Sequence, residues 1–128
     1  MQYTHDRLLA DTSLEDADGR VREALKAEGF GVLTEIDVKA TMKQKIDEDM
    51  DGYLILGACN PKMAWKAMEL EPRIGAMLPC NVILRSVDGG TEVSAIDPVA
   101  SMSAVDNAEL HEVAGQVRDR LVRALDAA

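Results

Sequence analysis

The chain has 128 residues, 47% of them hydrophobic and 3% aromatic, with a formal net charge of −9 at pH 7. This length suits one domain with a single, largely aliphatic core, so we expect one domain over residues 1–128. The acidic balance argues against nucleic acid or an anionic membrane as a partner, because both require a basic face.

The N-terminal segment and the two cysteines bear on the cellular compartment. No basic segment followed by an apolar run opens the sequence, and no apolar stretch is long enough to span a bilayer. These features predict a cytoplasmic protein. In that reducing compartment Cys59 and Cys80 would be thiols and not a structural disulfide.

The first part of the chain alternates strand and helix patterns. Residues 3–9 alternate as a strand does, and a helix with one apolar stripe follows from the N-cap Ser13 to Gly29. Residues 30–38 are rich in β-branched side chains and predict a second strand. Residues 39–50 predict a short amphipathic helix. Its apolar side would consist of Met42, Ile46 and Met50.

The middle of the chain holds the clearest boundaries. Residues 53–59 form an apolar run that predicts a strand buried on both faces. Asn60 is a favoured N-cap residue and Pro61 is favoured at the first helical position, so a helix begins there. It ends before Pro72, because the residue that precedes a proline avoids the α conformation. Residues 73–79 are expected to be a connection.

The last part of the chain predicts a hairpin and a long helix. Residues 80–87 and 91–97 read as strands joined by a Gly-rich turn. Residues 98–105 are expected to be irregular. Asp106, with Glu109 three residues later, would cap a final amphipathic helix that carries His111 on its surface.

This order of elements predicts an α+β fold with a single, mostly antiparallel β-sheet of about five strands. The long helices would pack on one face of that sheet. A doubly wound parallel sheet fits less well, because the sequence contains a hairpin and lacks Gly-rich βα loops.

The two cysteines are the first candidates for chemistry. Cys59 directly precedes a helix N-terminus, where backbone N–H groups and the helix dipole lower a thiol pKa. Cys80 opens a strand, and the pair has no C-x-x-C spacing. One interpretation is a thiolate or soft-ligand site. The other is two small buried side chains, which is the more common role of free cysteines.

Other candidates are weaker. His5 and His111 do not stand at metal-ligand spacing, and the methionines fall at helical spacings that core packing explains, so we expect no metal site. Glu71 and Asp97 each precede a proline, where a carboxylate could orient a ligand or act as a base. The alternative is a helix-terminating glutamate and a turn-forming aspartate. No catalytic motif is present, and the sequence leaves the cofactor unknown.

Three segments resemble the domain-of-unknown-function 302 family, a widespread prokaryotic group: GFGVLTEIDV, YLILGACNPKMAWKAMELEPRIGAMLPCNVIL and VSAIDP. The resemblance covers nearly the whole chain. It implies a curved antiparallel sheet with the topology of the TATA-binding protein, and it suggests a homodimer, but it supplies no biochemical role. The family motif falls on Cys59, Asn60, Pro61, Ala64, Glu71, Pro72, Gly75, Leu78, Pro79, Cys80, Asp97 and Pro98.

Three hypotheses about function follow. The first is a domain that binds a small anionic or thiophilic ligand, with five candidate ligand-binding residues: Cys59, Asn60, Glu71, Cys80 and Asp97. The second is a cysteine-dependent enzyme or redox protein, with Cys59 as the reactive thiol assisted by Glu71 or Asp97. The third is a dimeric interaction or assembly domain.

Overall fold

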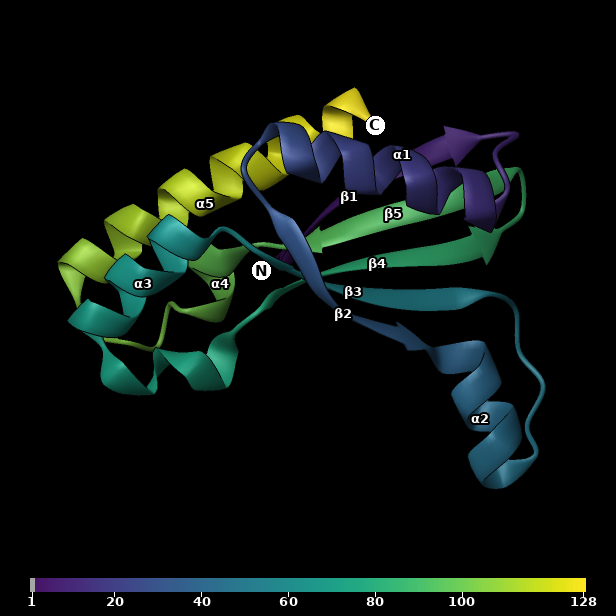
Figure 1. Cartoon of the computed structure of the whole chain (residues 1–128), viewed down its shortest axis with the longest axis horizontal. Coiled ribbons are helices and arrows are strands. Elements are labelled where there is room, and N and C mark those ends of the chain that lie inside the picture. Colours follow the sequence, from purple (N-terminus) through teal and green to yellow (C-terminus); the bar gives the residue numbers. More distant parts are fainter. Residues whose placement is uncertain (1) are drawn as a thin grey trace.

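The computed structural model describes residues 2–128, which form a five-stranded sheet and six helical segments (Figure 1). The strands are β1 (Thr4–Ala10), β2 (Gly31–Asp37), β3 (Tyr53–Cys59), β4 (Cys80–Val87) and β5 (Gly90–Ile96). The helices are α1 (Leu14–Ala27), α2 (Val38–Ile46), α3 (Pro61–Leu70), the 3-10 helix η1 (Pro72–Met77), α4 (Pro98–Ser101) and α5 (Ala108–Ala127).

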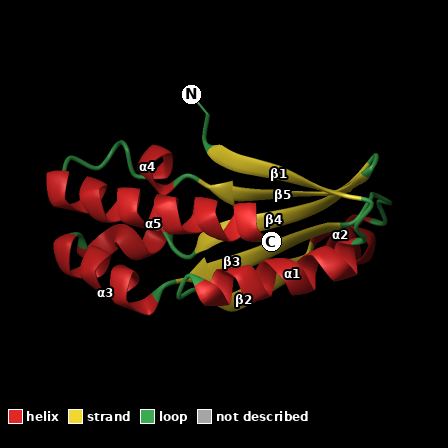
Figure 2. Cartoon of the chain, turned by 90° about the horizontal axis from the view of Figure 1, so that it is seen from above, coloured by secondary structure: helices red, strands yellow, loops and turns green. Residues whose placement is uncertain are grey.

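The sheet has the strand order β1-β5-β4-β3-β2, and every neighbouring pair is antiparallel. This confirms the predicted α+β fold with one antiparallel sheet. Helix α1 and the C-terminal half of α5 lie side by side over one face of the sheet (Figure 2).

The main core lies between the sheet and these two helices. Alternate residues of the central strands point toward the helices, as the period of a strand requires. The largest buried aliphatic side chains of this core are Leu56, Val82, Leu84 and Val93 from the sheet, Val21 and Leu25 from α1, and Leu121 and Leu125 from α5. The apolar stripes expected for the first and last helices are therefore confirmed.

A second, smaller core lies beyond the end of the sheet. The N-terminal half of α5 extends past the strands and packs with α3, η1 and α4. Its buried members are Ala67, Ile74, Met102, Leu110 and Ala114. The two cores meet along α5, and the connections that leave β3 and enter β4 run between them.

Helix α2 departs from the predicted arrangement. It projects from the side of the sheet opposite α1 and α5 (Figure 1), and none of its residues is buried. Met42 is 37% exposed and Ile46 is 62% exposed, so the apolar side expected for this helix is left uncovered. The helix ends at Ile46, before the predicted residue 50, because Asp47 adopts a left-handed conformation with φ 55°.

Four local predictions need correction. The connection over 73–79 is largely occupied by η1. The segment 98–105 begins with α4, because the Asp97 carboxylate accepts hydrogen bonds from the N–H groups of Val99 and Ala100. Asn107 and not Asp106 caps α5, with its side-chain oxygen 3.1 Å from Leu110 N. His111 is half-buried, and its Nε2 is enclosed without a hydrogen-bond partner within the described residues.

Over residues 2–128, every helix is too short or too polar to cross a membrane.

Candidate functional site

A narrow cavity lies where the ends of β3 and β4 meet the second core. Its empty volume is about 430 Å³, part of which is open to solvent. The side chains around it are almost all apolar, and they come from the strand ends, α3, α5 and the start of α4. Its lining includes Cys59, Asn60, Met63, Ala64, Cys80, Met102 and Val117.

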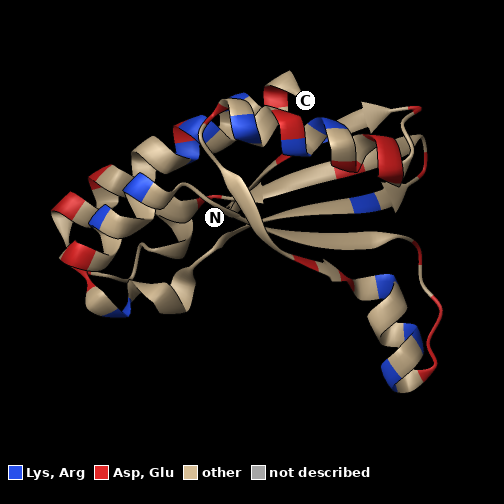
Figure 3. Cartoon of the chain, viewed as in Figure 1, with Lys and Arg blue, Asp and Glu red and all other residues tan. Residues whose placement is uncertain are grey.

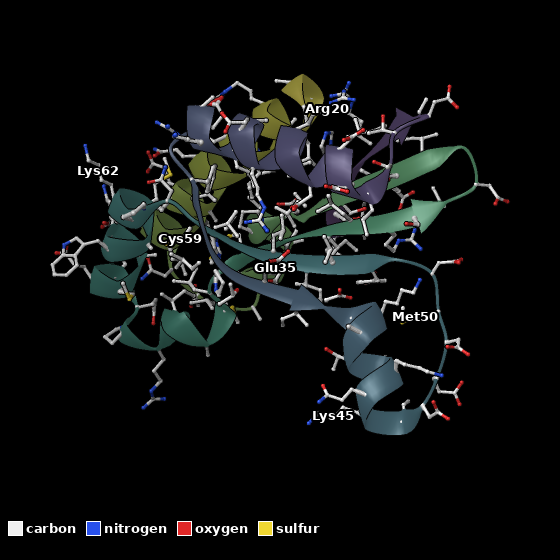
Figure 4. The ribbon with its side chains drawn as sticks, turned by 45° about the vertical axis from the view of Figure 1, so that its right-hand side comes forward. Arg20, Glu35, Lys45, Met50, Cys59 and Lys62 are labelled. Atoms are coloured by element: carbon white, nitrogen blue, oxygen red, sulfur yellow. The ribbon has the colours of Figure 1, made fainter. Side chains whose placement is uncertain are left out.

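The strand register brings the two cysteines to this cavity. Cys80 opens β4 opposite Ala58, which directly precedes Cys59 at the end of β3. The chain then turns into α3, where Asn60 caps the helix with its side-chain oxygen 3.4 Å from Met63 N. Figure 4 shows Cys59 where β3 passes into α3, and Lys62 extending outward from the first turn. The predicted helix start at Pro61 is confirmed.

Both thiols are held in the protonated form more strongly than a free cysteine. Burial raises the pKa of Cys59, and burial together with the nearby Cys59 sulfur raises the pKa of Cys80 from 9.0 to about 11. The sequence predicts the opposite direction for Cys59. The direction is reversed because burial raises the pKa of this thiol, and Asn60 already occupies the N–H of Met63.

Four sulfur-bearing side chains line the same cavity, which we call the sulfur-lined cavity: Cys59, Cys80, Met63 and Met102. Cysteine and methionine are soft, polarisable groups that fill irregular space and attract soft ligands. Over residues 2–128, no cluster of three or more His, Cys, Asp or Glu residues could hold a metal ion.

Comparison with known proteins identifies the family. A model described as "Domain of unknown function DUF302" matches residues 7–128. The chain belongs to the DUF302 family. It is also similar to the crystal structure of an uncharacterized conserved protein DUF302 from Bacillus stearothermophilus, with 26% sequence identity and a TM-score of 0.92 over 99% of this chain and 98% of that chain. No curated protein matches.

Two of the five candidate residues in this DUF302 protein lie away from the sulfur-lined cavity. Glu71 follows the C-terminus of α3, where its Oε1 accepts a hydrogen bond of 3.1 Å from Asn107 Nδ2. Asp97 caps α4 and faces a separate hollow beside His5 and Arg118. The structure therefore brings Cys59, Asn60 and Cys80 together, and it gives Glu71 and Asp97 roles at helix termini.

An arginine that the sequence analysis overlooked stands near the rim of this cavity in the DUF302 fold. Arg120 Nη1 donates a hydrogen bond of 3.3 Å to the carbonyl oxygen of Glu28. Gly29 follows with φ 85°, and a Cβ atom there would lie 3.0 Å from Asn60 Nδ2 and 3.8 Å from Arg120 Nη1. The absence of a side chain at Gly29 lets the amide and the guanidinium approach the same point. Val117 lines the cavity, and residues three apart on a helix lie on the same face. This spacing is the sequence signal that could have pointed to Arg120.

Proposed function

We propose that this protein binds a small, mainly apolar and thiophilic molecule in the sulfur-lined cavity. The observation that carries the proposal is that both cysteines line one apolar cavity together with two methionine side chains. Most of the 430 Å³ consists of crevices too narrow for solvent, and the cavity has room for about two water molecules as it stands. A ligand would therefore displace the flexible Met63 and Met102, which can repack at low cost.

Of the two expected kinds of ligand, the cavity favours a thiophilic molecule over an anion bound at the start of α3. Pro61 has no N–H group, and Asn60 satisfies the N–H of Met63. These positions would otherwise supply the donors for an anion at a helix N-terminus. The walls around the thiols are apolar, so burying a charge among them would be costly.

A cysteine-dependent enzyme receives less support. A thiol attacks as its thiolate, and burial raises the pKa of both cysteines above the ordinary value, so the protonated form dominates at neutral pH. Glu71 caps the far end of α3 and is bonded to Asn107, and Asp97 accepts hydrogen bonds from Val99 N and Ala100 N. Each carboxylate of the expected pair is therefore engaged away from Cys59. A reducing, cytoplasmic location belongs to the proposal, because both cysteines are free.

Toluene tests the apolar character of the cavity. We expect it to shift the methyl NMR signals of Met63 and Met102 in a saturable way, and to leave that of Met42 on α2 unchanged. Ala64→Phe, which fills the cavity, should abolish the effect, whereas Ala40→Phe on the exposed face of α2 should not. Unchanged signals at Met63 and Met102 would overturn the proposal of an apolar binding site.

Phenylarsine oxide tests the thiophilic character. Its arsenic atom forms two As–S bonds with a pair of thiols, and its oxygen leaves as water with the two thiol protons. We expect one equivalent bound per chain, measured by mass spectrometry of the intact protein, with loss of binding in Cys59→Ser and in Cys80→Ser. Retained binding in either variant would show that the thiols do not act together.

Self-association is a second candidate, favoured by two uncovered features. On the sheet face opposite α1 and α5, Ile36, Ile55 and Ile83 stand side by side in register. Next to them α2 has no buried residue. An exposed apolar face of this kind marks an interaction surface.

We propose a second copy of this chain as the occupant of that face, because the charges of the chain complement one another. Helix α2 carries three lysines and no acidic residue, in a protein with a net charge of −9, and an acidic segment follows it (Figure 3). Sedimentation equilibrium should give a dimer mass for the wild type and a monomer mass for Ile55→Lys. Trp65→Lys, an exposed change on α3, is the control. A monomeric wild type at all concentrations would reject this candidate.

A further inference from the structure

Arg120 lacks the partner that a half-buried cation normally has. Its one hydrogen bond within the described residues is the 3.3 Å bond from Nη1 to the carbonyl oxygen of Glu28. The carboxylate of Glu28 accepts instead from Arg123, with Nε 2.7 Å from Oε1. Within residues 2–128, no acidic side chain lies within 4.0 Å of the Arg120 guanidinium.

This situation stands out because the chain has an excess of carboxylates, with 23 Asp and Glu against 14 Lys and Arg. Among the other half-buried arginines, three are paired with carboxylates: Arg22 with Asp18 and Glu35, Arg85 with Glu92, and Arg118 with Asp119. The fourth, Arg7, donates three hydrogen bonds of 2.7–2.9 Å to carbonyl oxygens at the end of α5. A guanidinium presents a planar fork of N–H donors that fits a carboxylate, and partial burial strengthens that preference. Arg120 therefore retains unused capacity to bind an anion.

The Arg120 guanidinium lies near Asn60, a residue that lines the sulfur-lined cavity. The Nη1 atom and Asn60 Nδ2 are 3.8 and 3.0 Å from the point that a Cβ atom of Gly29 would occupy. Asn60 uses its side-chain oxygen to cap α3, and within residues 2–128 its Nδ2 has no acceptor. On α5, Val117 lies one turn before Arg120 and lines the cavity. Two sets of donors thus converge at the rim of an apolar space.

We propose that the ligand of the sulfur-lined cavity is a small apolar molecule with an anionic head group, a carboxylate being the simplest. The head group would accept hydrogen bonds from Arg120 and from Asn60 Nδ2, and the apolar body would extend toward Cys80. This inference rests on the proposed function. It moves the expected anion from the N-terminus of α3 to the rim of the cavity, where the charge stays partly hydrated.

Hexanoate and hexanamide, which share an apolar chain and differ in the charge of the head group, provide the test. Affinities are measured by NMR titration, following the Met63 and Met102 methyl signals. We expect hexanoate to bind at least 10-fold more tightly than hexanamide, because a charge-assisted hydrogen bond contributes more than a neutral one. Arg120→Gln should remove this preference, and Arg118→Gln on another side of α5 should keep it.

The outcomes separate the two proposals. Equal affinities for the two probes in the wild type would overturn the head-group inference and leave an apolar binding site. Failure of both probes to shift the methionine signals would overturn the inference together with the proposed function. Retained binding of hexanamide by Arg120→Gln shows that this variant is folded. A preference for hexanoate that survives in that variant would assign the anion to another residue.

Discussion

Glu71 and Asn107 are joined by a hydrogen bond of 3.1 Å from the Asn107 amide nitrogen to the Glu71 carboxylate. Asn107 uses its other side-chain atom, Oδ1, to cap α5 through Leu110 N. One side chain therefore begins one helix and is bonded to the residue that ends another. This link closes the outer end of the second core, at the far end of α3 from the cysteines.

Removal of the Asn107 side chain should destabilise the protein more than the loss of a surface contact. We expect Asn107→Ala to lower the free energy of unfolding by about 1–3 kcal/mol, because it removes an N-cap and leaves Glu71 without its donor. Asn107→Asp keeps the cap but places a second carboxylate near Glu71. Urea unfolding should rank the wild type above Asn107→Asp. Equal stability of these two would show that the link to Glu71 contributes nothing.

The raised pKa of Cys80 predicts a loss of stability in alkali. The folded protein holds this proton more tightly than the unfolded chain, so the stabilisation is fully present below pH 9. It is lost as the pH rises through the folded-state value of about 11. The expected size is about 2–3 kcal/mol.

Chemical unfolding of the wild type and of Cys80→Ala from pH 8 to pH 11 isolates this effect. The variant lacks the thiol but keeps the lysines and tyrosines that also titrate there. We expect the stability of the wild type to fall more steeply than that of the variant. Parallel curves would mean that the Cys80 thiol titrates as it does in the unfolded chain.

Two glycines should respond in opposite directions to replacement by alanine. At Gly57 in β3 a Cβ atom would overlap Thr34 Oγ1 and lie 2.6 Å from Pro79 Cγ, so Gly57→Ala should cost about 1–3 kcal/mol. At Gly115 within α5 a Cβ atom would meet nothing within 4 Å. Gly115→Ala should therefore stabilise the protein by about 0.5–1 kcal/mol through helix propensity. Thermal unfolding of both variants checks the two signs together.

Apolar residues of α2 and α5 should differ sharply in their contribution to stability. Ile46 on α2 is exposed, so Ile46→Ala should change the free energy of unfolding of the isolated chain by less than about 0.5 kcal/mol. Leu110 in the second core is fully buried, and Leu110→Ala should cost about 2–5 kcal/mol. Urea denaturation at low protein concentration makes the comparison. A large loss in Ile46→Ala would contradict the exposed position of this side chain.

Local sequence patterns predicted much of this fold. The observed bounds of β3 and β4 coincide with the predicted 53–59 and 80–87, because turn residues and prolines mark their ends. The start of α3 was equally clear, since Asn60 and Pro61 suit the first positions of a helix for independent reasons.

The errors arose where distant contacts decide the outcome. Asp106 and Asn107 are both good N-cap residues, and the tertiary bond from Asn107 to Glu71, 36 residues away, accompanies the cap that forms. Helix α2 has an amphipathic pattern, but the pattern does not indicate whether another element covers its apolar side, and no residue of α2 is buried.

The candidate site was predicted only in part. The spacing of Cys59 and Cys80 could not show that both line one cavity, because this depends on the register of β3 with β4. The direction of the thiol pKa depended on burial, which local sequence does not give. Arg120 was missed because it approaches Asn60 only where both side chains lie near Gly29, and these three residues are far apart in the chain.

The uncovered helix α2 has a consequence for how such a protein can diverge. Because α2 contributes no buried residue, substitutions along Val38–Ile46 escape the selection that core packing imposes. The strand ends that carry Cys59 and Cys80 have no such freedom. A lineage of these domains could therefore remodel the surface of α2 while inheriting the same sulfur-lined cavity.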